Sequence, residues 1–162
     1  MYGSTNLNEL NDESTLDAVV RLIGNPASGE LYLSDIRSKA AVSLERYGRY
    51  LAELFREHCI TVPPAVNLQA GLGGEVKVVG DHPERAVVER LFKNNQKLIK
   101  GFKELEVVHE IIRTQEEAML NQQLRQRNPG AAAQLEANAG VPLFNLGITS
   151  GGALAFFSQA SN

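Results

Sequence analysis

The sequence contains no tryptophan, one cysteine and few aromatic residues among its 162 positions. Because Cys59 has no second cysteine to pair with, no internal disulfide forms and nothing indicates an oxidising compartment. No segment approaches the ~20 apolar residues that a membrane-spanning helix needs. The N-terminal segment is polar and carries no Lys or Arg before Arg21, so it lacks the pattern of a secretory signal. These absences favour a cytoplasmic protein without a membrane span. Secretion by a signal-peptide-independent route is the alternative.

The chain also lacks a strong excess of charge of either sign. It has 16 Lys and Arg against 19 Asp and Glu, which gives a net charge of −3. Much of that surplus lies in the first 14 residues, which hold three acids and no base, whereas residues 15–127 are almost balanced. The overall charge therefore favours neither nucleic acid nor an anionic membrane as a partner.

Hydrophobic patterning divides the chain into three regions. Residues 1–13 are rich in polar side chains and predict a disordered tail. Residues 14–127 carry helical periodicity and predict a single helical domain with a β-hairpin near residues 66–79. Residues 128–162 are apolar but broken by glycines, which predicts a Gly-rich apolar tail outside the core. The expected fold class is α+β, predominantly helical, with amphipathic helices and a small hairpin.

The first half of the domain predicts two helices. Ser14 and Asp17 resemble a capping box that starts a short helix ending near residue 23. Apolar residues then recur on one face over residues 35–59, with Ser34 as the expected N-cap. Gly48 lies in the middle of this second helix, where glycine costs about 1 kcal/mol relative to alanine. We therefore expect another backbone to approach Gly48 closely.

A hairpin and a helical pair follow. The glycine-rich turn at residues 71–74 separates two strand-like runs, and because an isolated hairpin is marginal in water, it needs a third strand or helices to pack on. Residues 30–33 are the candidate third strand. Gly80-Asp81-His82-Pro83-Glu84 predicts a helix start with Asp81 as N-cap. Asn94 or Asn95 either ends this helix or caps the next. Residues 114–127 predict a helical extension that projects past the core.

Part of this region resembles a pattern in small uncharacterised bacterial proteins. The resemblance rests on the hairpin followed by Gly80-Asp81-His82-Pro83, Val88-Glu89, Leu91-Phe92, Leu98 and Phe102-Lys-Glu-Leu105. It implies a bacterial origin and a helix-pair module. It implies no activity, because these residue types serve helix capping and core packing.

The candidate residues for catalysis, metal binding and cofactor binding lack the spacing or the neighbouring elements that such motifs require. His58 and Cys59 are neighbours on a helix and point about 100° apart, so we interpret Cys59 as packing at a helix end. His58, His82 and His109 lack metal-ligand spacing, and His109 is interpreted as a hydrogen-bonded core histidine. The turn at 71–74 leads into a strand, unlike a phosphate loop. We therefore expect no enzyme, no metal and no cofactor.

A run of bases is the strongest candidate for a charged ligand. It consists of Arg90, Lys93, Lys97, Lys100 and Lys103, with no acid between Arg90 and Lys103. On one continuous helix these side chains would share one side, where they could contact phosphates. A solvated lysine face is the commoner explanation, because no motif with stacking aromatics accompanies the bases. An anion or nucleic-acid binder is accordingly the alternative function.

The favoured function is a non-catalytic protein-interaction or assembly module of a bacterial cell. Apolar residues beyond the predicted core would be poorly covered in a monomer and are expected to contact a protein partner or a second copy. These candidate interaction residues are Leu120, Leu124, Phe144, Leu146, Phe156 and Phe157.

Overall fold

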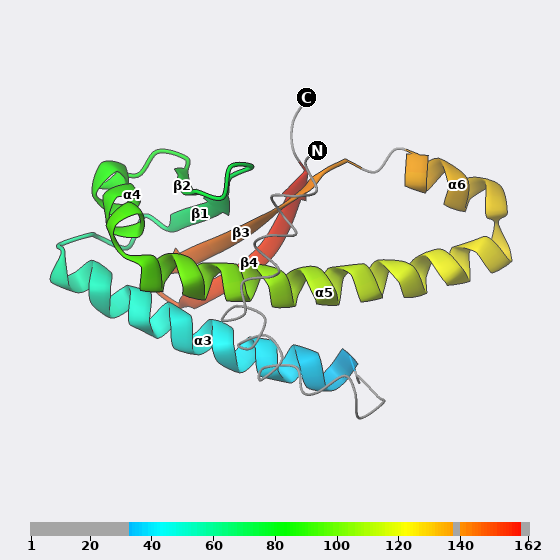
Figure 1. The fold of residues 1–162 in the computed structure, drawn as a ribbon, viewed down its shortest axis with the longest axis horizontal. Coiled ribbons are helices and arrows are strands. Elements are labelled where there is room, and N and C mark those ends of the chain that lie inside the picture. Colours follow the sequence, from blue (N-terminus) through cyan, green and yellow to red (C-terminus); the bar gives the residue numbers. More distant parts are fainter. Residues whose placement is uncertain (1–32, 138–139, 160–162) are drawn as a thin grey trace.

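The computed structural model describes residues 33–137 and 140–159. The described elements, in chain order, are α3 (Leu33–Glu57), β1 (Val66–Ala70), β2 (Val76–Val79), α4 (Arg85–Asn94), α5 (Gln96–Arg127), α6 (Pro129–Ala137), β3 (Pro142–Thr149) and β4 (Gly152–Gln159). The predominantly helical α+β class is confirmed (Figure 1). The disordered tail predicted for 1–13 and the helix predicted for 14–23 lie outside the described residues. So does the strand candidate at 30–33, except Leu33, which begins α3.

The four strands form one antiparallel sheet in the order β2-β1-β3-β4. The predicted hairpin at 66–79 is confirmed as β1 and β2, with Leu68 opposite Val78. Its third strand is β3, which pairs with β1 so that Leu68 lies opposite Leu146. The C-terminal hairpin thus enlarges the N-terminal one into a sheet wide enough to support helices on one face.

The prediction of a Gly-rich apolar tail outside the core at 128–162 is therefore wrong. Within it, α6 follows α5 directly, and β3 is an inner strand between β1 and β4. Its glycines do not interrupt the strands: Gly152 adopts a φ of +130° where the β3–β4 turn ends, a conformation that glycine tolerates without strain. The apolar residues of β3 belong to the core.

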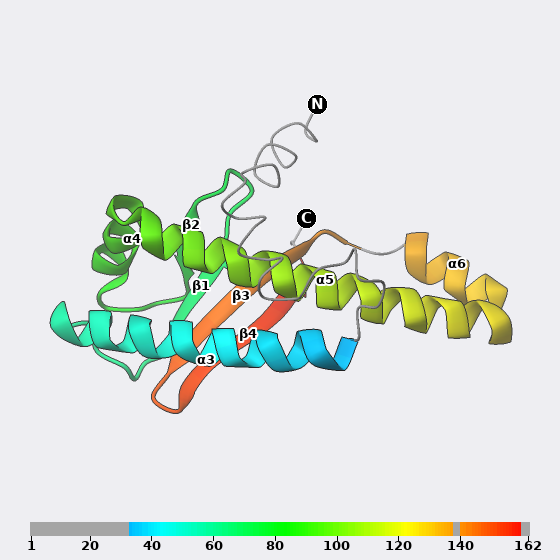
Figure 2. The ribbon, with the colours of Figure 1, turned by 60° about the horizontal axis from the view of Figure 1, so that its bottom comes forward.

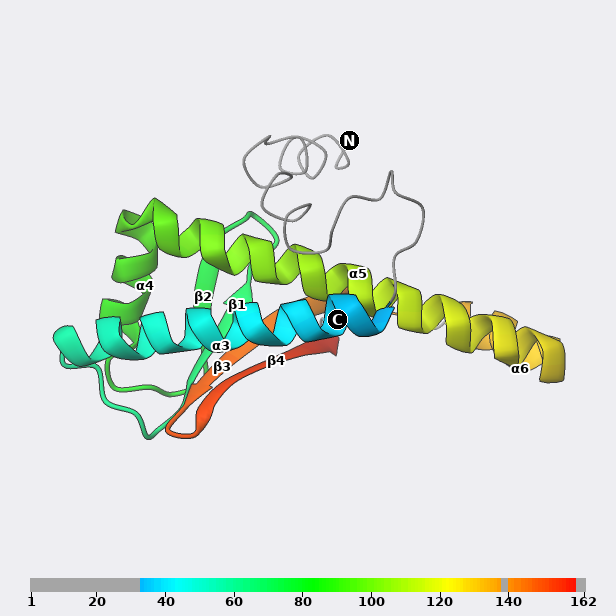
Figure 3. The same ribbon diagram turned by 90° about the horizontal axis from the view of Figure 1, so that it is seen from below.

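The core lies between one face of the sheet and the helices α3, α4 and α5. Alternate strand residues point inward, including Leu68, Val78 and Leu146, and they meet Phe55, Phe92 and other helix residues in one cluster. Helices α3 and α5 lie side by side across the sheet, and α4 packs near β2 (Figure 2). Within the described residues, the helices cover only this face, as the view from below also shows (Figure 3).

Gly48 confirms the expectation of a close approach. A Cβ at this position would lie 2.6 Å from the Cβ of Ala153 in β4. Gly48 is itself buried, so α3 reaches the sheet at the point where its side chain is missing. The helix begins two residues earlier than predicted, at Leu33, so Ser34 lies inside it rather than at its N-cap.

The start of α4 differs from the prediction. The helix begins at Arg85, and its N-cap residue is Glu84, not Asp81. Glu84 instead reaches back to Thr61, whose backbone N–H and hydroxyl donate to its Oε1 at 3.1 and 2.9 Å. These two hydrogen bonds lower the pKa of Glu84. His82 is buried: its Nδ1 accepts from the Glu84 N–H, so its Nε2 donates to the Thr61 carbonyl at 2.9 Å.

Asn95 separates α4 from α5. Its side chain accepts hydrogen bonds from the N–H groups of Lys97 and Leu98, which confirms it as the cap of the second helix. From Thr114 onward α5 is almost entirely exposed, as predicted, and extends beyond the sheet (Figure 1). Helix α6 packs beside this extension, where Arg125 pairs with Glu136. No described helix is long and apolar enough to span a membrane.

Phe144 is expected to be the most sensitive side chain of β3. Its ring contacts three other rings, those of Phe102, His109 and Phe157, at centroid distances of 5.4 to 5.6 Å. Phe144→Ala should lower the free energy of unfolding by about 3–5 kcal/mol in urea titrations, because it opens a cavity in this cluster. The control is Val79→Ala in β2, at a strand residue with 43% exposure. It should cost less than about 1 kcal/mol. Equal losses in the two variants would contradict the placement of β3.

Candidate functional site

The candidate interaction residues divide into buried and exposed groups. Phe144 and Leu146 are 2% and 0% exposed, so their assignment to an outward surface is wrong. They alternate with Asn145 along β3, and this period of two directs them to the helix side of the sheet. Phe157 faces the same side and is half-buried beneath the guanidinium of Arg113, which lies 5.4 Å from its ring centroid.

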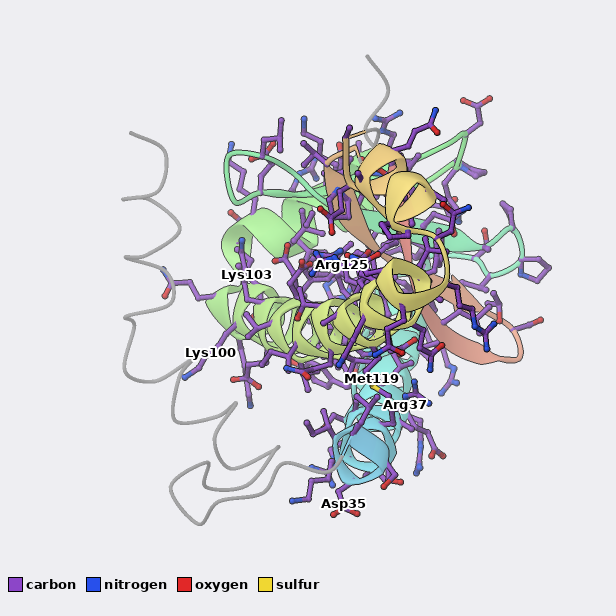
Figure 4. The ribbon with its side chains drawn as sticks, turned by 90° about the vertical axis from the view of Figure 1, so that its right-hand side faces the viewer. Asp35, Arg37, Lys100, Lys103, Met119 and Arg125 are labelled. Carbon is purple, nitrogen blue, oxygen red and sulfur yellow. The ribbon has the colours of Figure 1, made fainter. Side chains whose placement is uncertain are left out.

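The other three candidates remain at least partly accessible. Phe156 is 47% exposed on the outer face of the sheet, and Leu120 is 57% exposed on the α5 extension. Leu124 is half-buried. Met119, labelled in Figure 4, precedes Leu120 and is 54% exposed. Because Glu116 of the same extension pairs with Arg37 of α3, this surface mixes apolar groups with paired charges.

The edge strand β4 presents a different kind of surface. It pairs with β3 on one side only, so alternate N–H and C=O groups along its eight residues point away from the sheet. The whole stretch from Pro142 to Gln159 contains no charged residue. On the outer face, Leu154 is 61% exposed beside Phe156. The strand therefore lacks both the charged side chains and the prolines that usually protect a sheet edge.

The opposite edge of the sheet is protected. Glu89 of α4 accepts a hydrogen bond from the outward N–H of Val78 in β2, at 3.0 Å. The same short strand carries Lys77, whose ammonium pairs with Glu75. Among the described residues, no helix side chain bonds the free edge of β4 in this way. In the described part of the chain, one edge of the sheet is thus closed and the other is left open.

Polar amides occupy the centre of the outer face. Asn145 is 4% exposed although it points away from the helices. Its Oδ1 accepts from Gln69, and its Nδ2 donates to the Leu143 carbonyl and the Ser158 hydroxyl, at 2.9 to 3.1 Å. These bonds satisfy the amide within the sheet. The exposed apolar side chains Leu154 and Phe156 lie beside this amide pair, on β4.

The basic run is split by the boundary at Asn95. Arg90 and Lys93 belong to α4, whereas Lys97, Lys100 and Lys103 belong to α5, and the two helices run in different directions (Figure 1). Lys103 pairs with Glu106, with 3.7 Å between the ammonium and the carboxylate. The single five-residue face expected on a continuous helix therefore does not form. Lys100 extends away from the body of the protein (Figure 4).

Lys97 and Lys100 instead line a groove between α3 and α5. The groove has a volume of about 600 Å³. Its lining residues come from both helices: Ser43, Arg46, Tyr47 and Tyr50 from α3, and Lys97, Lys100, Gly101, Glu104 and Leu105 from α5. Sequence patterns did not indicate Arg46 and Tyr50, because they lie outside the apolar arc of their helix and their neighbours on α5 are distant in sequence.

Tyr47 fixes the floor of this groove. Its hydroxyl donates to the Leu98 carbonyl at 2.6 Å. Its ring occupies the space beside Gly101, where a Cβ would lie only 2.5 Å from the nearest ring carbon. Burial raises the pKa of Tyr47 well above its ordinary value, with smaller contributions from Tyr50 and Glu104. The phenol therefore stays protonated and continues to donate.

His58 and Cys59 follow Glu57, the last residue of α3, and among the described contacts no hydrogen bond joins their side chains. The His58 ring nitrogen Nδ1 lies 3.0 Å from the Leu54 carbonyl, one helical turn earlier. Cys59 adopts a φ of +57° and is exposed, so it lies at a helix end as interpreted but does not pack there. The described part of the chain holds no group of three or more His, Cys, Asp or Glu side chains that could bind a metal ion.

His109 lies against the core, as interpreted. Its Nδ1 is 2.8 Å from the Leu105 carbonyl, and its ring is 5.5 Å from that of Phe144. Desolvation lowers the pKa of His109 from its ordinary value of 6.5, although the bond to Leu105 opposes this shift. The folded protein thus keeps this imidazole neutral under conditions in which the unfolded chain binds a proton.

This shift predicts a pH-dependent stability. Well above pH 6.5 the imidazole is neutral in both the folded and the unfolded chain, so it does not make the free energy of unfolding depend on pH. As the pH falls below 6.5, protonation of the unfolded chain should lower the free energy of unfolding. His109→Gln should flatten this part of the profile in urea titrations across pH. The surface control Leu72→Ala, at a residue that is 86% exposed and does not titrate, should keep the wild-type slope. A His109→Gln profile as steep as wild type would show that His109 titrates alike in both states.

Two surfaces therefore stand out in the described structure. One is the open edge of β4 with its apolar outer side chains, and the other is the basic groove between α3 and α5. Both depend on elements that are distant in sequence, so neither corresponds to a local motif. Comparison of the chain with protein-family models, with curated proteins and with solved structures finds no significant match.

Proposed function

We propose that this chain is a non-catalytic assembly module that associates with a second copy of itself through β4. The observation that carries the proposal is the uncharged edge that the described sheet leaves open. Eight residues of β4 offer backbone donors and acceptors, and Leu154 and Phe156 add exposed apolar surface beside them. We further propose that the protein is bacterial and cytoplasmic and that it has no enzymatic activity.

Self-pairing of β4 is geometrically simple. An antiparallel pair of identical strands is related by a two-fold axis, so each copy offers the same edge to the other. The result would be one continuous sheet, twice as wide as the four-stranded sheet of one copy, whose inner edges no longer expose backbone groups. The absence of charge on β4 supports this arrangement, because like charges on paired strands would face one another across the axis.

The contrast between the two edges supports a specific role for β4. Glu89 closes the β2 edge with a hydrogen bond to Val78, and α4 packs beside it. Sheet edges left unprotected are prone to pair with other strands, and proteins usually blunt them. A chain that blunts one edge and leaves the other free of charge is suited to ordered pairing on that one side.

The double variant Leu154→Lys/Phe156→Lys tests this proposal. Both side chains are exposed, so the subunit should keep its fold by circular dichroism. Wild-type protein should elute as a dimer in size-exclusion chromatography with light scattering. The double variant should elute as a monomer, because lysines from both copies would meet across the paired strands. Amide hydrogen exchange in β4 should also slow as the wild-type concentration rises.

Leu72→Lys is the matched control. Leu72 is 86% exposed in the β1–β2 turn, and β3 separates that hairpin from β4. This variant should remain dimeric. A wild-type protein that is monomeric at every concentration would overturn the proposal, as would a dimer that Leu72→Lys disrupts as strongly as the β4 variant.

A further inference from the structure

The groove between α3 and α5 has the dimensions of a small-molecule site. Its volume of about 600 Å³ falls inside the range typical of ligand pockets. It lies between α3 and α5, which pack against each other and form its two walls. The bond from Tyr47 to Leu98 joins those walls and holds the floor in place. The groove is therefore built on rigid elements before any ligand arrives.

The charges around the groove favour an anion. Arg46, Lys97 and Lys100 contribute three cations, and Glu104 contributes one acid. Within the described residues, none of these three cations forms an ion pair. Neighbouring bases differ, since Arg49 pairs with Glu45 and Lys103 pairs with Glu106. In the described part of the chain, the bases that line the groove thus have no carboxylate partner.

Aromatic surface accompanies these cations. Tyr50 is 39% exposed on the groove wall, whereas its neighbour Tyr47 already donates its hydroxyl to α5. A flat ring can stack on an exposed tyrosine, while arginine and lysine bind phosphate oxygens. Glu104 lies one helical turn beyond Lys100 and repels phosphate, so it favours the end of the groove formed by Lys97 and Lys100.

We propose that this groove binds a nucleotide, with its phosphates on Arg46, Lys97 and Lys100 and its base against Tyr50. Cations without an ion-pair partner among the described residues and an exposed ring at one cavity together select an organic phosphate that carries a flat ring, and a mononucleotide has this chemistry. The site is independent of β4 pairing, because its described lining residues all belong to α3 and α5.

Isothermal titration calorimetry of the full chain provides the test, with ADP, pyrophosphate and a single-stranded oligonucleotide as probes. ADP should bind saturably at one site per chain, and pyrophosphate more weakly because it lacks a ring. Lys97→Gln/Lys100→Gln should weaken ADP binding at least about tenfold, since charge-assisted bonds to phosphate are lost. Tyr50→Ala should weaken ADP by about tenfold and leave pyrophosphate unchanged.

Lys93→Gln is the matched control, because Lys93 is an exposed lysine on α4 outside the groove. It should bind ADP like wild type. Three results would overturn the proposal: no saturable binding of ADP, an equal loss in the control, or an equal effect of Tyr50→Ala on ADP and pyrophosphate. Binding of the oligonucleotide without binding of ADP would assign the cations to a nucleic-acid strand and would equally overturn it.

Discussion

The insertion of β3 between β1 and β4 is the constraint on which the rest of the structure depends. Without β3, β1 and β2 would form an isolated hairpin, which is marginally stable in water. With it, the sheet gains the width to carry α3 and α5 side by side, and Phe144 joins rings from α5 and β4 into one cluster. Gln69 and Asn145 lie opposite each other in this sheet although they are 76 residues apart in sequence. The pairing of β3 with β1 therefore couples the β3–β4 hairpin to the β1–β2 hairpin.

Both candidate surfaces follow from this arrangement. Because β3 lies between β1 and β4, β4 is the outer strand of the described sheet, and its outward backbone groups arise from the same pairing that completes the core. Because the sheet holds α3 against α5, Arg46 and Lys97 line one groove. Gly48 lets α3 approach Ala153 of β4, and Gly101 leaves room for the Tyr47 ring in the groove. Two glycines that weaken their helices locally thus allow the close packing on which each surface depends.

Much of the fold could be predicted from local patterns. Periodicity identified α3, the β1–β2 hairpin and the α5 extension, and capping patterns placed the boundary between α4 and α5 at Asn94 or Asn95. The prediction of a tail at 128–162 is wrong because the glycines do not interrupt the strand: Phe144, Leu146 and Ile148 alternate with Asn145 and Gly147 in the period of a half-buried strand. Pairing partners could not be predicted, because strand alternation fixes which side chains share a face and carries no information about which distant strand lies alongside.

The same distinction explains the sites. The basic run was visible in sequence, but its division at Asn95 depended on whether one helix or two formed there, and its new neighbour Arg46 depended on how α3 crosses α5. The β4 edge is a property of strand order, which no residue of β4 encodes alone. What the residues of β4 do encode is the lack of charge that makes an open edge consequential, since a single lysine there would discourage pairing with little effect on the fold. The charge and polarity of each residue could thus be predicted from the sequence. Which residues lie together, and which strand is at the edge, depend on the strand order of the folded sheet.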